Sequence, residues 1–194
     1  MMKRDQCLKI LARGIGEDDI VVPVYQAAFE WMLIRPSDLN YVTTGAMGQA
    51  SSHALGLALA FPGRRVLVID GDGSLLMNLG ALITCAEQNP PNLYHFLGNN
   101  GVYEANGSHP LPGAGKTDFC ALARAAGFPA AHRFADLGDF EAGLPAVLQA
   151  PGPVFVDLHV EQGEPYPQDY TVLHSAERRA RFKRAVNLKA APRP

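Results

Sequence analysis

The chain has 194 residues, of which 47% are hydrophobic and 19% charged, and its formal net charge is −2. We expect one globular domain over residues 1–189 and a disordered tail over 190–194. The near-neutral charge gives no reason to expect a nucleic-acid partner. No apolar stretch is long enough to cross a membrane, and no signal peptide is recognisable. Three widely spaced cysteines indicate reduced thiols in a cytoplasmic protein.

The first third of the chain predicts alternating helices and strands. In order, we expect a helix, a strand, a helical turn or two, a short strand and a helix, over residues 3–13, 20–24, 27–34, 40–44 and 49–60. Pro23 indicates that the first strand lies at an edge or ends irregularly. His53, within the last helix, is interpreted as a buried, hydrogen-bonded structural residue.

The pattern of the central part of the chain predicts two strands that flank one crossover helix. Residues 66–69 are a β-branched apolar run, typical of a strand buried on both faces. Helical spacing follows, carried by Leu75, Leu76, Leu79, Leu82 and Ile83, and a second apolar run covers 93–97.

The rest of the chain repeats this alternation. Further helices are predicted over 118–126, 136–150 and 175–187, and strands over 130–134 and 154–160. We expect Pro145 to kink or interrupt its helix, and Phe182 and Val186 to dock the basic last helix on the domain or on a partner. The whole pattern predicts an α/β fold, with three layers and a doubly wound, mostly parallel sheet.

Each of the two central strands ends in a small polar cluster. In an open parallel sheet, ligands bind beyond the carboxyl ends of the strands. Gly71 and Gly73 let the backbone approach a ligand, and Ser74 opens a helix whose free N–H groups favour phosphate. Asp72 would repel a diphosphate unless a cation lay between them. With the side-chain oxygen of Asn100, it makes an all-oxygen site that suits magnesium.

Other interpretations of these clusters fit the residues less well. A dinucleotide-binding fingerprint needs a third glycine where the chain has Leu76, and a P-loop needs a Gly-Lys-Ser/Thr run that is missing. A purely structural alternative makes Asp72 a helix cap and Asn99-Asn100 a turn. It accounts less well for two polar clusters at neighbouring strand ends together with the Gly-Met-Gly loop at 45–48.

Gly71-Asp72-Gly73 followed by Asn99-Asn100 resembles the signature of thiamine diphosphate enzymes, in their diphosphate-binding domain. The resemblance extends to residues 45–48, and over 40–128 it is most similar to the small β subunits of phosphonopyruvate and sulfopyruvate decarboxylases. It implies magnesium ligands in Asp72, Asn100 and the Val102 carbonyl. It also implies a bulky apolar side chain that keeps the cofactor bent, which is Met47 here. The cofactor-binding residues implied are Gly45, Met47, Gly71, Asp72, Gly73, Ser74, Asn100, Val102 and Tyr103.

In that family the glutamate that activates the cofactor comes from a separate pyrimidine-binding domain, and no glutamate here matches it. The resemblance therefore implies the thiamine diphosphate- and magnesium-binding subunit of a two-chain 2-oxo acid decarboxylase. Its partner would be an α-type subunit, its substrate a small 2-oxo acid, and it would be a homo-oligomer when alone. Catalytic residues stay unassigned, with Glu104 and His109 as candidates for substrate contact. Lys116 and Thr117 are either an anion contact or a solvated loop.

Two other functions remain open. The same motif occurs in thiamine-dependent carboligases and oxidoreductase subunits, although the chain lacks the cysteine clusters that iron–sulfur centres need. A non-catalytic cofactor-binding or scaffold protein is the alternative from a different class. It is favoured by residues 25–28, where the family tends to have an Asn/Thr-Gly turn and this chain has Tyr-Gln-Ala-Ala.

Overall fold

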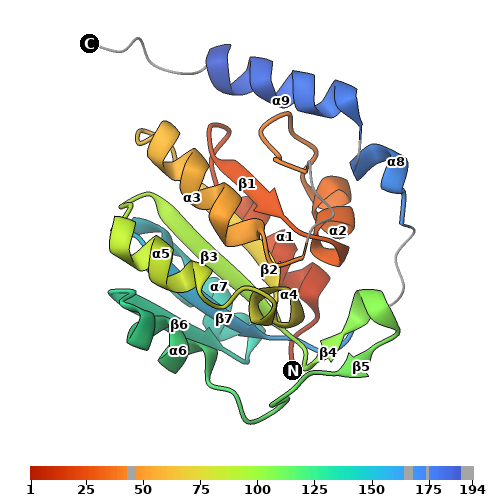
Figure 1. Ribbon diagram of the computed structural model, residues 1–194, viewed down its shortest axis with the longest axis vertical. Helices are drawn as coiled ribbons and strands as arrows, with labels where there is room; N and C mark the ends of the chain where they lie inside the picture. The colour runs from red at the N-terminus through yellow and green to blue at the C-terminus, as the bar shows by residue number, and fades with distance from the viewer. Residues whose placement is uncertain (43–46, 164–167, 174, 189–194) are drawn as a thin grey trace.

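The computed structural model describes residues 1–42, 47–163, 168–173 and 175–188. At its centre is a sheet with the strand order β1-β2-β3-β7-β6, in which every neighbouring pair is parallel. Helices lie on both faces of this sheet (Figure 1), so the predicted doubly wound α/β fold is confirmed. The strands are Ile20–Pro23 (β1), Val66–Gly71 (β2), Leu93–Asn99 (β3), Ala130–Phe134 (β6) and Val154–His159 (β7).

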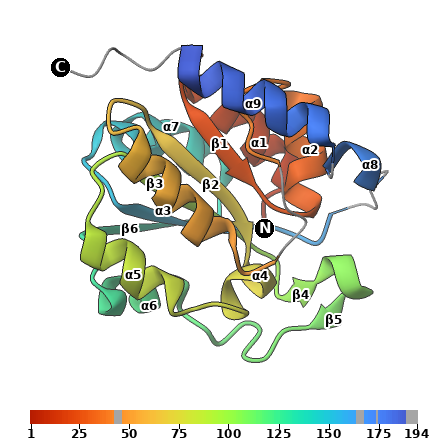
Figure 2. The same ribbon diagram turned by 45° about the horizontal axis from the view of Figure 1, so that its top comes forward.

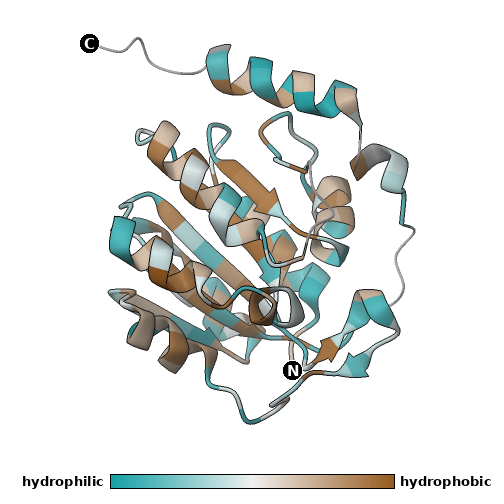
Figure 3. Ribbon diagram, in the orientation of Figure 1, coloured by the Kyte–Doolittle hydropathy of each residue, from teal (hydrophilic) through white to brown (hydrophobic). Residues whose placement is uncertain are grey.

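The core is divided into two layers by the alternation of side chains along each strand. Val66 and Val68 of β2 point to one layer, and Leu67 and Ile69 point to the other. Both faces of the central strands are therefore apolar (Figure 3), as in other parallel sheets covered on both sides. Helices α3 (Ala50–Ala60), α5 (Ala81–Gln88) and α6 (Phe119–Ala126) contribute to the first layer, and α1 (Arg4–Gly14), α2 (Gln26–Ile34) and α7 (Leu137–Gln149) to the second.

The prediction of a single crossover helix between β2 and β3 is wrong. The structure has a short helix, α4 (Asp72–Leu76), then a turn and the separate α5. The turn contains Gly80, a weak helix former, and the side-chain amide of Asn78 donates to the Gly48 carbonyl at 2.9 Å. Ile83 is exposed, so the apolar spacing was only partly a core pattern. The break lets the turn hold the loop that precedes α3.

Three smaller expectations also need correction. Residues 40–42 form an isolated bridge between Asn40 and Val21 instead of a strand, and 43–44 lie outside the described residues. Pro145 sits inside a continuous α7 and does not interrupt it. His53 is partly exposed, packs against the Tyr41 ring and has no hydrogen-bond partner at Nδ1 among the described residues.

Past β3, a small antiparallel hairpin extends from the sheet beside α4 (Figure 2). It consists of β4 (Val102–Tyr103), a 3-10 turn η1 (Glu104–Asn106) and β5 (His109–Pro110). The sequence predicted only a polar loop there, because two-residue strands carry no recognisable alternation.

The C-terminal helices α8 (Tyr170–Leu173) and α9 (Ala176–Leu188) follow β7 along the chain. Phe182 and Val186 of α9 are buried, and the Phe182 ring meets Tyr41 edge-on at 5.0 Å, so the predicted docking on the domain is confirmed. The predicted tail at 190–194 lies outside the described residues. All three cysteines are buried and free, as expected. Within the described ranges, no helix combines the length and apolarity needed to span a membrane.

Candidate functional site

Strands β2 and β3 end side by side, with Gly71 in register with Gly98, and a cleft opens beyond these ends. Residues predicted to bind the cofactor line this cleft together, although they come from three separate parts of the chain. Gly45 lies outside the described residues. The predicted residues found in the cleft are Met47, Gly71, Asp72, Gly73, Ser74, Asn100, Val102 and Tyr103.

Asp72 is a buried acid in the wall of the cleft. Its Oδ1 accepts the backbone N–H of Gly73 at 2.8 Å, and its Oδ2 accepts those of Asn100 and Gly101 at 3.0 and 2.6 Å. The side chain thus binds one N–H group in the first turn of α4 and fixes the turn after β3, but the N-cap of α4 is Gly71, so Asp72 is not the helix cap that the purely structural alternative makes it. Burial raises the pKa of the Asp72 carboxyl to about 6, although the three N–H groups lower it. No basic side chain among the described residues pairs with it, which leaves the carboxylate suited to a cation.

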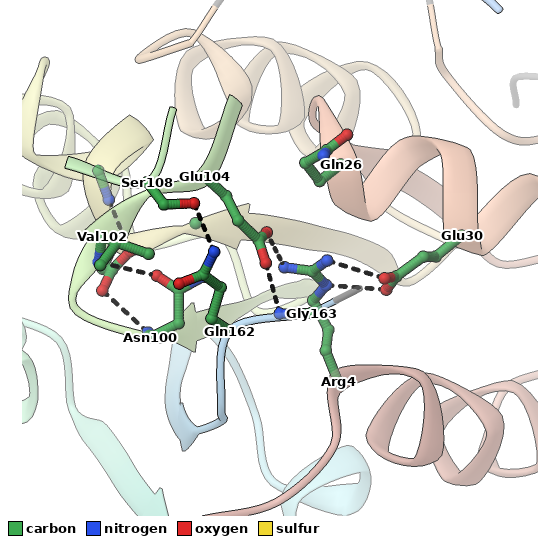
Figure 4. Close-up of polar contacts among 12 residues, drawn as sticks. Arg4, Gln26, Glu30, Asn100, Val102, Glu104, Ser108, Gln162 and Gly163 are labelled. Carbon is green, nitrogen blue, oxygen red and sulfur yellow. Dashed lines mark hydrogen bonds and ion pairs between the residues drawn. The ribbon is translucent and has the colours of Figure 1, made fainter. Parts of the chain in front are cut away.

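The oxygen of Asn100 lies in the same turn, where its Oδ1 accepts the backbone N–H of Val102 at 3.0 Å (Figure 4). Carboxylate, amide and main-chain carbonyl oxygens are the donors that Mg²⁺ prefers, with phosphates and waters completing its shell. The described residues contain no group of three His, Cys, Asp or Glu side chains that could hold a metal by themselves. This donor set therefore fits a magnesium ion that is shared with a phosphate.

Ser74 ties the preceding loop to the cleft. Its buried Oγ accepts the backbone N–H of Gly48 at 2.9 Å, and Gly48 adopts a φ of +80° that favours glycine. These contacts place Met47 in the cleft wall. The hydroxyl predicted to face a phosphate thus also holds the loop that carries Met47.

Position 73 requires glycine because side chains of the hairpin region lie very close to its backbone. A Cβ at this position would lie 2.6 Å from Cδ1 of Tyr103 and 3.1 Å from Cδ2 of Leu111. The Tyr103 ring therefore lies against the backbone at the start of α4, and any larger residue would push the hairpin away from it.

Tyr25 has a strained backbone at the edge of the cleft. It precedes α2 with φ 51° and ψ −121°, a region that a bulky residue adopts only at a cost of about 1–3 kcal/mol. Glycine takes this conformation readily. The chain therefore departs from the family's Asn/Thr-Gly turn in sequence and yet keeps a backbone that glycine would favour there.

The residues proposed for substrate or anion contact lie in different places in the structure. Glu104 lines the cleft, but its two carboxylate oxygens already accept from Arg4 and from the backbone N–H of Gly163. His109 is exposed and is not among the described residues that line the cleft. Lys116 and Thr117 line a second cavity of about 420 Å³, which shares Asp72 and Asn100 with the cleft.

Sequence reasoning missed one fully buried acid, Asp157 of β7. It accepts from Nδ2 of Asn99 at 3.1 Å, from Nε of Arg133 at 3.3 Å and lies 3.2 Å from Nε2 of His159. Its carboxylate therefore gathers three side chains at the same end of the sheet as the cleft. The available signal was a single acid within the otherwise apolar run at 154–158.

Comparison with known proteins supports the resemblance. The family model for the thiamine pyrophosphate enzyme, C-terminal TPP binding domain, matches residues 23–158. The chain belongs to this family. Sulfopyruvate decarboxylase subunit beta of Methanothermobacter thermautotrophicus is 40% identical over 164 residues, which cover 84% of this chain and 84% of that protein.

Other members of the family are longer. Phosphonopyruvate decarboxylase of Streptomyces viridochromogenes is 34% identical over 155 residues, which cover 80% of this chain but only 38% of that protein. A solved structure described as a thiamin diphosphate-dependent enzyme from Mycobacterium smegmatis superposes with a TM-score of 0.70 at 23% identity. The superposition covers 86% of this chain and 32% of the chain in that structure. It confirms the fold. This thiamine pyrophosphate-binding domain thus corresponds to one part of such enzymes.

Proposed function

We propose that the chain is the thiamine diphosphate- and magnesium-binding subunit of a two-chain 2-oxo acid decarboxylase that acts on 3-sulfopyruvate or 3-phosphonopyruvate. The observation that carries this proposal is the match to a decarboxylase β subunit over 84% of both chains. The cleft is consistent with it, since it contains the residues expected to bind the diphosphate end of the cofactor.

Each cleft residue has a role in this proposal. Asp72, Asn100 and the Val102 carbonyl hold the metal, and the start of α4 presents backbone N–H groups to the diphosphate. Met47, fixed through Gly48, supports the middle of the cofactor. Bound thiamine diphosphate supplies a nucleophilic carbon and an electron sink for the loss of CO₂.

The activating acid is proposed to come from a partner chain. Three acids line the described cleft, and each is engaged within the chain. Asp70 accepts the N–H of Gly71 and lies 3.5 Å from Nε2 of His95. Asp72 and Glu104 are held by the contacts described above. None of the three is free to bind the pyrimidine ring, so an α-type subunit is proposed to supply that glutamate.

The test is to co-express the full chain with the α-type subunit encoded in the same genome. With thiamine diphosphate and magnesium added, CO₂ release is then followed from 3-sulfopyruvate, 3-phosphonopyruvate and pyruvate. Turnover of one of the first two supports the proposal. No release from any of the three overturns the decarboxylase assignment and favours a non-catalytic cofactor-binding role.

A carboligase is the second candidate. Acetolactate synthase 2 of Zea mays is 31% identical over 172 residues, although these cover only 26% of that protein. The same reconstituted complex separates the two candidates, because condensation of two pyruvate molecules would identify a carboligase. The smaller share of the maize enzyme covered by the match makes the decarboxylase subunit the better-supported function.

A further inference from the structure

A buried guanidinium lies in the wall of the cleft between two carboxylates (Figure 4). Arg4, the first residue of α1, donates from Nε and Nη2 to the two oxygens of Glu30, both at 2.8 Å. Its Nη1 donates to Glu104 of η1. The side chains of Arg4, Glu30 and Glu104 are 10%, 2% and 10% exposed, so this group of charges is largely shielded from water.

The contacts join parts of the chain that are far apart in sequence. Besides α1, α2 and η1, they include the stretch after β7, because the backbone N–H of Gly163 donates to Oε1 of Glu104 at 2.5 Å. A Cβ on Gly163 would lie 2.8 Å from Nη2 of Arg4, so the backbone approaches this pair closely. We call Arg4, Glu30, Glu104 and Gly163 the Arg4 clasp.

Within the described part of the chain, the β4–β5 hairpin has few other side-chain attachments to the domain. Its strands have two residues each, and a two-stranded hairpin is marginally stable by itself. The Leu111 side chain is buried beside Gly73, and the Gln162 amide donates to the Ser108 hydroxyl at 2.5 Å. Among the residues that the structure describes, the clasp is the charged attachment of the hairpin, and it lies directly beside the cleft.

The clasp affects the cleft because Glu104 directly follows two residues that line it. Glu104 directly follows Val102 and Tyr103, the two residues of β4 that line the cleft. Holding Glu104 therefore restricts the backbone of β4, which carries the Val102 carbonyl and the Tyr103 ring that lies against Gly73. The guanidinium matters because removing it would leave two shielded carboxylates without their cation, which is strongly unfavourable.

We propose that Arg4 is a positioning residue that holds the β4–β5 hairpin closed over the cleft, and through Glu104 orients the Val102 carbonyl toward the metal. This inference rests on the proposed function for the identity of the ligand. For the attachment of the hairpin, it rests only on the contacts of Arg4 and Glu104 described above. In this arrangement Glu104 is part of the attachment and does not exchange a proton with the substrate.

The attachment is tested by hydrogen exchange on the full chain, comparing wild type with Arg4→Met and Glu104→Gln. Glu104→Gln leaves the pair of Arg4 and Glu30 intact, so it serves if Arg4→Met folds poorly. Arg13→Met is the matched control, because Arg13 is on the same helix and pairs with Glu141 on the exposed surface. We expect exchange over residues 101–111 to rise about tenfold in both test variants, as expected for a locally opened segment, and to stay unchanged in the control.

The consequence for the cleft is tested by calorimetric titration of the same variants, each reconstituted with the α-type subunit, with thiamine diphosphate and magnesium. We expect about a tenfold loss of affinity in Arg4→Met and no further loss in the double variant with Glu104→Gln, since the two changes break one contact. Hairpin exchange equal to that of Arg13→Met overturns the clasp. Faster exchange with unchanged affinity overturns the positioning role. A wild-type complex that binds no cofactor overturns the proposed function, while the exchange result still decides the clasp.

Discussion

The side-chain amide of Asn99 donates to Oδ1 of Asp157 at 3.1 Å, which joins the ends of β3 and β7 beside the cleft. Asp157 has no exposed surface, and Arg133 and His159 also approach its carboxylate. This acid therefore supports the residue that directly precedes the proposed metal ligand Asn100.

We expect Asp157→Ala to lower the free energy of unfolding by about 3 kcal/mol, because three polar side chains lose a buried partner. Denaturant titration measures this loss. Asp118→Ala is the control: Asp118 also pairs with Arg133, but it is half-exposed and caps α6, so a clearly smaller loss is expected there. Equal losses in the two variants would show that the buried carboxylate of Asp157 stabilises the fold no more than an exposed one does.

Asp72→Ala is expected to abolish magnesium-dependent binding of thiamine diphosphate, because it removes the charged ligand of the proposed cation site. Asn100→Ala should weaken binding less, since a water can replace one neutral oxygen. Calorimetry on the reconstituted complex measures both affinities, and circular dichroism checks that the fold is kept. Undiminished affinity in Asp72→Ala would refute the metal assignment.

The pH dependence of stability should also report on Asp72. Burial raises the pKa of its carboxyl from 3.8 to about 6, so between these values the folded chain holds a proton that the unfolded chain has lost. The free energy of unfolding of the metal-free chain should therefore fall as the pH rises through this window. Relative to wild type, Asp72→Ala should be less destabilising at about pH 7 than at about pH 4.5, by roughly 2 kcal/mol. A difference that does not depend on pH would contradict the raised pKa.

The sheet and most of the cleft could be predicted because their signals are local. The apolar runs of β2 and β3 mark buried strands, and because the carboxyl ends of neighbouring parallel strands meet at one edge, the sequence alone predicts that Asp72 and Asn100 lie together. The turn between α4 and α5 was missed because Asn78 bonds to Gly48, 30 residues away, and no local pattern records that contact.

The charged contacts around the cleft could not be predicted for the same reason. Arg4 and Glu104 are 100 residues apart, and Arg4 and Glu30 are 26 apart. An arginine near the start of a helix and a glutamate in a polar loop are ordinary surface residues by sequence. Only the fold shows that they share one buried site, and that Glu104 is already engaged there.

Assembly is the subject of the last prediction, and two features of the chain bear on it. The acids that line the cleft among the described residues are all engaged by other groups of the chain, so none of them is free to bind the pyrimidine ring. Large apolar side chains, Met77 and Ile83, are exposed on the turn and helix that follow α4. Exposed apolar surface near an incomplete site is typical of an interface.

We therefore expect the isolated chain to self-associate, to bind thiamine diphosphate weakly and to release no CO₂ from 3-sulfopyruvate or 3-phosphonopyruvate. Adding the α-type subunit should convert it into a symmetric mixed complex, with activity appearing in the same fractions. Light scattering and a turnover assay, run on the chain alone and on the mixture, measure both effects. A monomer that is fully active by itself would place the activating carboxylate within these 194 residues, and the division of the site between two chains would then be wrong.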